Sequence, residues 1–144
     1  MRLEVTLPDG WREVPAEKGH AYRREHPGAG TLRLSLVPGS PDLVGDGAAA
    51  LARLEQLQEE IDLELGKMLR SSHGRAASGV VAATVRKHPR HGIIAQWLLP
   101  LGKVMALGTY QMGSRETVKR EVREANRIIA TARFLEVEDS PLVG

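Results

Sequence analysis

The chain has 144 residues, a net charge of +2 and no cysteine. This length is typical of one domain that buries a core without disulfides or a structural metal. The lack of cysteine excludes disulfides, thiol nucleophiles and zinc–thiolate sites, and the small net charge predicts no dominant attraction to nucleic acid or anionic membranes. Without a signal-like N-terminus or a membrane-length apolar run, we expect a cytoplasmic protein with no direct membrane insertion.

Alternating apolar and polar residues predict strands in the first part of the chain. Residues 3–7, "LEVTL", alternate in this way and precede a "PDG" turn and Trp11. Residues 20–25 and 31–37 flank the turn "HPGAG", so they predict a hairpin. In its second strand, Leu32, Leu34 and Leu36 would face the core.

A long central helix is predicted over residues 47–70, with Asp46 as its N-cap. Apolar residues recur at steps of three and four and would form one buried stripe. The members of this stripe are Leu54, Leu57, Ile61, Leu65 and Met68.

Three successive strands are predicted at 79–85, 92–99 and 103–112, and the short links between them indicate an antiparallel meander. A last helix is expected from about residue 115 to 134, with Ser114 as its N-cap. The predicted fold class is therefore α+β: an antiparallel sheet of an N-terminal strand, a hairpin and the meander, packed with a central and a C-terminal helix. Residues 1–135 would form one domain, and residues 136–144 a flexible acidic tail.

The segment "VRKHPRHG" carries the densest cluster of basic side chains. These are Arg86, Lys87, His88, Arg90 and His91. Its simplest interpretation is a solvated hairpin tip, because Pro89 interrupts strand pairing there. Two alternatives are a small anion-contacting patch and a metal pair of His88 and His91, which would need a third ligand. We expect no bound metal.

No other pattern predicts catalysis. The sequence has no nucleophile elbow, no phosphate-binding loop and no dinucleotide fingerprint. The carboxylates on the predicted central helix fit a solvated face. A basic strip on the last helix, formed by Arg120, Arg123 and Arg127, lacks the interleaved aromatic residues of single-strand nucleic-acid binders. We therefore expect no enzyme activity, no cofactor and no nucleic-acid partner.

The strands at 92–99 and 103–112 are apolar on both faces, so both faces must be covered. The central helix would cover one face. The other would be covered either by the closing helix or in part by a second copy or a client segment. The second alternative predicts a homodimer or a protein partner that contacts Ile94, Leu98, Met105, Leu107 and Met112.

In the order of these elements the chain resembles the PsbP-like fold, which photosystem accessory proteins, bacterial DcrB-type proteins and a yeast Ran-release factor share. The segments that carry the resemblance are "LPDGW" at 7–11, "TLRLSLV" at 31–37, "GIIAQWLLPLGKVMALGTY" at 92–110 and "NRIIATARF" at 126–134. One bacterial branch, the chaperones of type VI secretion effectors, is similar in its Leu-Pro-x-x-Trp turn. The resemblance implies an accessory or binding role without a shared catalytic centre.

Three functions follow as predictions from these observations. The first is a non-catalytic protein-binding module, such as a secretion-associated chaperone or adaptor that acts as a homodimer. The second is a small-ligand or lipid-binding domain of the same fold. The third is a nucleic-acid-binding factor or an unrecognised enzyme.

Overall fold

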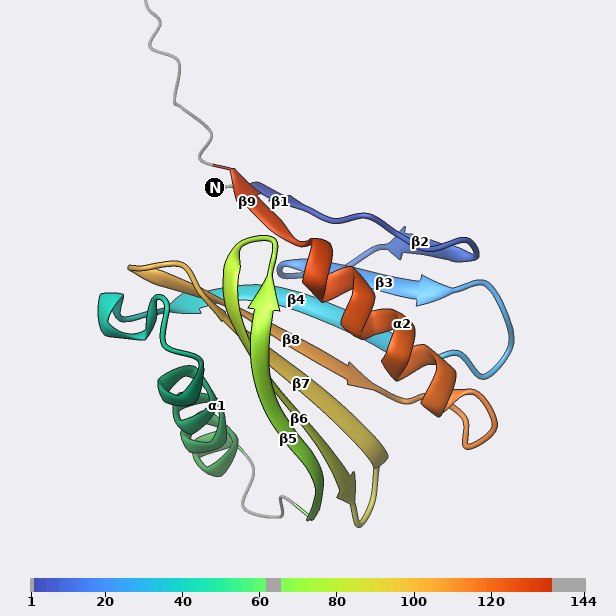
Figure 1. Cartoon of the computed structure of the whole chain (residues 1–144). Coiled ribbons are helices and arrows are strands. Elements are labelled where there is room, and N and C mark those ends of the chain that lie inside the picture. The colour runs from blue at the N-terminus through green and yellow to red at the C-terminus, as the bar shows by residue number, and fades with distance from the viewer. Residues whose placement is uncertain (1, 62–65, 136–144) are drawn as a thin grey trace, which may run out of the picture.

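The computed structural model describes residues 2–61 and 66–135 (Figure 1). It contains one seven-stranded antiparallel sheet and a separate two-stranded sheet. In spatial order the large sheet consists of β2 (Trp11–Val14), β3 (His20–Arg24), β4 (Thr31–Pro38), β8 (Val104–Gln111), β7 (Gly92–Pro100), β6 (Gly79–His88) and β5 (Lys67–Ala76). The predicted α+β class, the hairpin of β3 with β4 and the meander of β6, β7 and β8 are confirmed. The tail at 136–144 lies outside the described residues.

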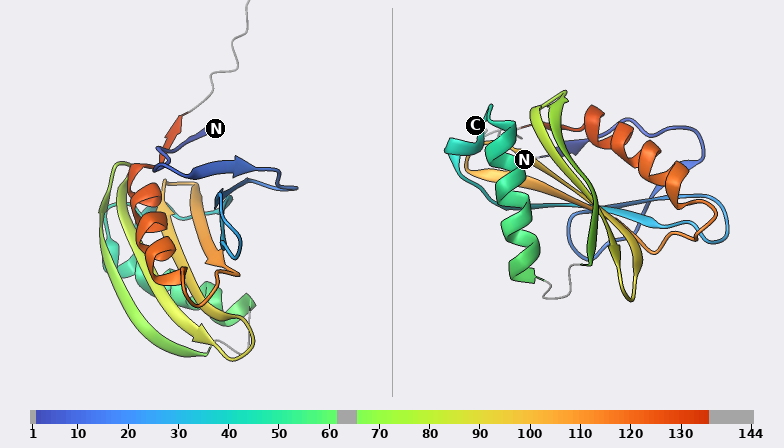
Figure 2. Two further views of the ribbon diagram at one scale, coloured as in Figure 1. Left: turned by 90° about the vertical axis from the view of Figure 1, so that its right-hand side faces the viewer. Right: turned by 60° about the horizontal axis from the view of Figure 1, so that its bottom comes forward.

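Two helices cover opposite faces of the large sheet. Figure 2 shows α1 (Gly47–Ile61) and α2 (Val118–Thr131) on either side of strands β5 to β8. The chain's own helices therefore cover both faces of the meander. This agrees with the alternative in which the closing helix covers the second face.

The α1 layer holds the smaller core. Asp46 caps the helix as predicted, because its Oδ1 accepts the amide of Ala49 at 3.0 Å. Ala50 and Leu54 are fully buried against the sheet. The buried members of this core are Ala50, Leu54, Val80, Ala82, Leu98 and Met105.

The α2 layer holds the larger core, to which four strands contribute aromatic side chains. Trp97 and Tyr110 are among its largest fully buried side chains. Its members on α2 are Ala125, Ile128 and Ile129. Its members on the sheet are Trp11, Tyr22, Leu32, Leu34, Ala95, Trp97, Leu99, Ala106 and Tyr110.

The predicted helix over 47–70 is wrong in its second part. The helix α1 ends at Ile61, and Lys67–Ala76 forms strand β5, which pairs antiparallel with β6. Gly66 lies at the start of this strand with φ of +73°, and a Cβ there would lie 2.2 Å from the carbonyl oxygen of Lys87. The backbone of β6 thus approaches too closely for any side chain at this position, and Met68 belongs to the sheet instead of the helical stripe.

The chain ends also differ from the prediction. The first strand, β1 (Arg2–Glu4), pairs with β9 (Arg133–Leu135) and not with the hairpin. The segment after the "PDG" turn forms the short strand β2, which the sequence pattern did not predict. At the other end, α2 begins three residues later than expected, with Thr117 in place of Ser114 as the N-cap.

Candidate functional site

A cleft of about 420 Å³ lies between α2 and the sheet half formed by β5, β6 and β7. This volume is within the range of about 300–1,000 Å³ that is typical of ligand pockets. The cleft is lined by Leu69, Arg70, Ser72, Ala83, Thr84, Val85, Ile93, Trp97, Val118, Lys119, Val122, Arg123 and Asn126.

The C-terminal end of α2 is joined to the turn between β5 and β6 by hydrogen bonds. There the amide of Ala77 donates to the carbonyl of Ala130 at 2.9 Å. The hydroxyl of Ser78 donates to the carbonyl of Ala132. Toward the other end of α2, Val118 and Val122 are only half-buried and line the cleft.

The floor of the cleft is apolar and anchored. The indole of Trp97 is 2% exposed, and its Nε1–H donates to Oδ1 of Asn126 on α2 at 3.1 Å. This bond fixes the distance between the sheet and the middle of α2. Ala83, Val85 and Ile93 complete the apolar floor on the sheet side.

The rim of the cleft is basic. Arg70, Lys119 and Arg123 line it, all three are exposed, and the cleft has no acidic residue in its lining. Lys119 and Arg123 are four residues apart on α2, so they lie on one face of the helix. Within the part of the chain that the structure describes, no ion pair involves any of these three side chains. An apolar floor below unpaired cations favours a partner with apolar and negatively charged groups.

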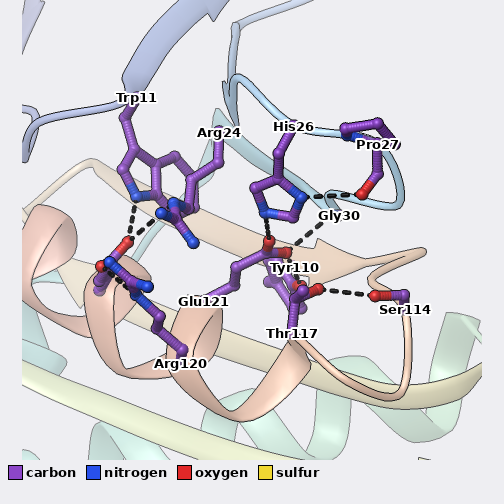
Figure 3. A network of polar contacts seen from close by, with 11 residues as sticks. Trp11, Arg24, His26, Pro27, Gly30, Tyr110, Ser114, Thr117, Arg120 and Glu121 are labelled. Atoms are coloured by element: carbon purple, nitrogen blue, oxygen red, sulfur yellow. Dashed lines mark hydrogen bonds and ion pairs between the residues drawn. The ribbon is translucent and has the colours of Figure 1, made fainter.

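A second polar cluster surrounds Glu121, which is fully buried on α2 (Figure 3). Its Oε1 accepts the amide of Gly30 at 2.8 Å and the hydroxyl of Tyr110. Its Oε2 lies 2.6 Å from Nε2 of His26. Burial, together with the hydrogen bond to Glu121 and its charge, raises the pKa of Tyr110 well above its ordinary value.

The imidazole of His26 links this cluster to the β3–β4 turn. Its Nδ1 lies 2.8 Å from the carbonyl oxygen of Pro27, while Nε2 faces Glu121. The ring therefore contacts the turn and α2 at once. Each oxygen of Glu121 has a hydrogen-bond partner, and this arrangement is that of a structural network that joins the turn to α2.

One turn further along α2, Glu124 joins the helix to β2 and β3. Its Oε2 accepts the indole Nε1–H of Trp11 at 2.6 Å, and its Oε1 accepts Nε of Arg120 at 3.2 Å. Nε of Arg24 lies 3.5 Å away as an ion pair without hydrogen-bond geometry. Burial raises the pKa of Glu124, but the bonds from Trp11 and Arg120 and the charges of Arg24 and Arg120 together lower it below its ordinary value.

This lowered pKa predicts a pH-dependent stability. A carboxylate whose pKa is lower in the folded state stabilises the fold above its unfolded pKa, which is about 4.3 for Glu, and loses this contribution as the pH falls through the folded value. We expect wild type to exceed Glu124→Gln in free energy of unfolding at neutral pH, and the difference to shrink below about pH 4. Urea unfolding of both proteins at neutral and acidic pH measures this difference in free energy of unfolding. A difference that does not change with pH would contradict the lowered pKa of Glu124.

The predicted partner-binding residues do not form one surface. Leu98 and Met105 are 0% and 1% exposed beneath α1, so a partner cannot reach them, and their predicted role is corrected to core packing. Leu107 is half-buried and packs against the same core, and Ile94 is half-buried on β7. Met112, with φ of 71°, is 68% exposed.

The predicted anion patch is divided between two environments. His88 is 3% exposed, and its Nδ1 accepts the amides of Arg90 at 3.0 Å and His91 at 3.2 Å. The ring of His88 thus organises the β6–β7 turn and stacks on His91, with 4.5 Å between the centroids.

Arg86 points to α1 and donates from Nε to Oε1 of the buried Gln58 at 3.1 Å. Lys87 is exposed. Among residues 2–61 and 66–135, no three His, Asp or Glu side chains gather as a metal site.

The sequence did not predict the cleft, because its residues come from four elements and one of these, β5, was predicted in part as helix. Only Arg123 had been singled out, as part of a basic strip with Arg120 and Arg127. The structure separates these three, since Arg120 pairs with Glu124 and Arg127 does not line the cleft. The useful signal was the combination of Val118 and Val122 with Lys119 and Arg123, which indicates a helix face that is apolar and basic together.

No protein-family model matches the sequence, and no curated protein does. Solved structures are nevertheless similar in fold. LpqN, described as involved in cell envelope biogenesis of Mycobacterium tuberculosis, aligns with a TM-score of 0.57 and 13% identity over 90% of this chain and 81% of LpqN.

A structure from Bacteroides thetaiotaomicron aligns with a TM-score of 0.54 and 15% identity over 93% of this chain. The chain spans 45% of that protein's length. Neither α1 nor α2 has the length and apolar character that a membrane-crossing helix requires. At these identities, the similarities show the fold alone.

Proposed function

We propose that the chain is a non-catalytic binding module, and that its cleft between α2 and strands β5–β7 receives a protein segment with apolar and acidic side chains. One observation carries this proposal: Arg70, Lys119 and Arg123 surround an apolar floor and have no ion-pair partner among the described residues. Elsewhere on α2, Glu124 neutralises Arg120. A partner's carboxylates would neutralise the three rim cations in the same way.

The chemistry of the buried groups supports a role without catalysis. Glu121, Tyr110 and His26 form a cluster of titratable side chains that bond to one another and to backbone groups. The cleft is not lined by any of them. A general acid or base must reach a substrate proton, and Glu121 and Tyr110 are both 0% exposed.

We also propose that the chain is a member of the PsbP-like fold family and has an accessory role. LpqN's described involvement in cell envelope biogenesis is compatible with an accessory role. The secretion-chaperone role, the homodimer and the cytoplasmic location stay predictions. The apolar sheet face that suggested a homodimer is occupied by α1.

The cleft volume favours one alternative, a small amphipathic anion in place of a protein segment. A space of about 420 Å³ accommodates a compact ligand, and the same floor and rim would bind it.

The proposal predicts that anilinonaphthalene sulfonate, an aromatic anion that fluoresces in apolar sites, binds this cleft. Arg123→Glu should weaken the binding about ten-fold, because it removes one attraction and adds a repulsion. Arg127→Glu is the matched control, since it makes the same charge change on the same helix but outside the cleft. A fluorescence titration of the three proteins measures the dissociation constants.

Both variants lie on the exposed side of α2, so circular dichroism should show an intact fold for each. Saturable dye binding that Arg123→Glu weakens and Arg127→Glu preserves supports the proposal. Equal effects of the two substitutions, or no saturable binding to wild type, would rule out the cleft as the site.

A further inference from the structure

The outer edge of β5 borders the cleft. β5 is the last strand of the seven-stranded sheet, it has ten residues, and almost all of them are exposed. The opposite edge strand, β2, has only four residues. A long edge strand presents unpaired backbone amides and carbonyls that are a template for another strand.

The pairing pattern shows which amides face outward. β5 and β6 are joined by the two-residue turn Ala77–Ser78, with Ala76 opposite Gly79. The residues that flank such a turn form a hydrogen-bonded pair, and hydrogen-bonded and non-bonded pairs alternate from there along the ladder. By this alternation Ser71, His73 and Arg75 direct their amides and carbonyls away from β6, toward solvent.

The charge of this edge selects the partner. Between Gly66 and Gly79 the chain carries Lys67, Arg70 and Arg75 and no acidic residue. A second copy of β5 would bring like charges together, which disfavours self-pairing. An acidic segment would gain attraction at the same positions.

We propose that the partner is an extended segment in which acidic and apolar residues alternate, and that it adds to β5 as an eighth antiparallel or parallel strand. This inference rests on the proposed function of the cleft. Leu69, Arg70 and Ser72 belong both to β5 and to the cleft lining, so one face of an added strand continues the cleft floor. Alternate side chains of the segment face the cleft beside Arg70, and the others face the opposite side of the sheet, where Arg75 pairs with Val80 of the α1-side core. Backbone bonds supply affinity and the alternate side chains supply specificity.

The test uses a blocked synthetic peptide of about eight residues in which glutamate and valine alternate, long enough for one strand. Calorimetry should show binding to the wild-type chain. Amide exchange of Ser71, His73 and Arg75 should slow on binding, whereas exchange of Ser72 and Gly74, whose amides face β6, should not change. The same peptide methylated on alternate backbone amides should not bind, because it cannot complete the ladder.

Ser71→Pro and Ser71→Ala form a matched pair of variants. Proline removes the outward amide without removing a bond to β6, whereas alanine removes only the exposed hydroxyl. Ser71→Pro should weaken peptide binding at least about ten-fold, while Ser71→Ala should bind like wild type. Both variants should bind the aromatic sulfonate normally, which shows that the fold and the cleft are intact.

The outcomes separate strand addition from the function of the cleft. Peptide binding that depends on Arg123 but leaves the β5 amides unprotected, or that tolerates Ser71→Pro, overturns strand addition and leaves the cleft standing. Dye binding in the cleft without any peptide binding also overturns strand addition. Failure of both the dye and the peptide overturns both proposals.

Discussion

Glu121→Ala is expected to lower the free energy of unfolding by about 3–5 kcal/mol, because it removes one partner of a buried charged network. The carboxylate is fully buried and holds Gly30, Tyr110 and His26 at once. Its loss leaves an amide, a hydroxyl and an imidazole without an acceptor and opens a cavity beside Tyr110. Urea unfolding measures the change.

Two comparisons make this result specific. Glu116→Ala removes an exposed carboxylate just before the same helix and should change stability by less than about 0.5 kcal/mol. Tyr110→Phe, alone and with Glu121→Ala, completes a double-mutant cycle, in which a coupling energy above zero is expected for groups in contact. A loss below about 1 kcal/mol for Glu121→Ala would show that the network does not hold the β3–β4 turn on α2.

Leu54→Ala should cost about 2–5 kcal/mol through the cavity that it leaves between α1 and the sheet. Leu54 is 0% exposed and packs in the core with Leu98 and Met105. Because α1 contacts β5, β6 and β7, its detachment would expose the whole second face of the meander. Thermal and urea unfolding both measure the lost free energy of unfolding.

Val44→Ala serves as the control, since Val44 precedes the same helix and is 54% exposed. It should change stability by less than about 0.5 kcal/mol. If Leu54→Ala unfolded at the wild-type midpoint, α1 would not be part of the core, and the apolar face beneath it would be free for a partner as the sequence suggested.

The sequence predicted the hairpin and both helices from their apolar periods, and the meander from the short links between three apolar segments. It failed at 67–70, where Met68 continues the helical spacing but belongs to β5, while Leu65 lies outside the described residues. The strand β5 that begins at Lys67 is nearly all exposed, so it has no alternation that would reveal it. Its formation depends on pairing with β6, which is a non-local interaction that a periodic pattern does not contain.

The cleft could not be predicted for a related reason. Arg70 and Arg123 are more than fifty residues apart in the sequence, and only the strand at 67–76 brings Arg70 to the rim. Read as part of the central helix, Arg70 would lie far from α2. The sequence singles out the basic cluster at 86–91 instead. In the structure, His88 accepts amides of the β6–β7 turn, and Arg86 donates to Gln58.

An amide chemical-shift map of the isotope-labelled chain, titrated with anilinonaphthalene sulfonate, locates the binding surface directly. The largest changes should fall on the two walls of the cleft, at Arg70, Ser72, Val85, Ile93, Val118, Lys119, Val122 and Arg123. Small changes are expected on α1 and at the β6–β7 turn. Changes centred on Arg86 to His91 or on the α1 side of the sheet would contradict the assignment of the cleft as the binding site.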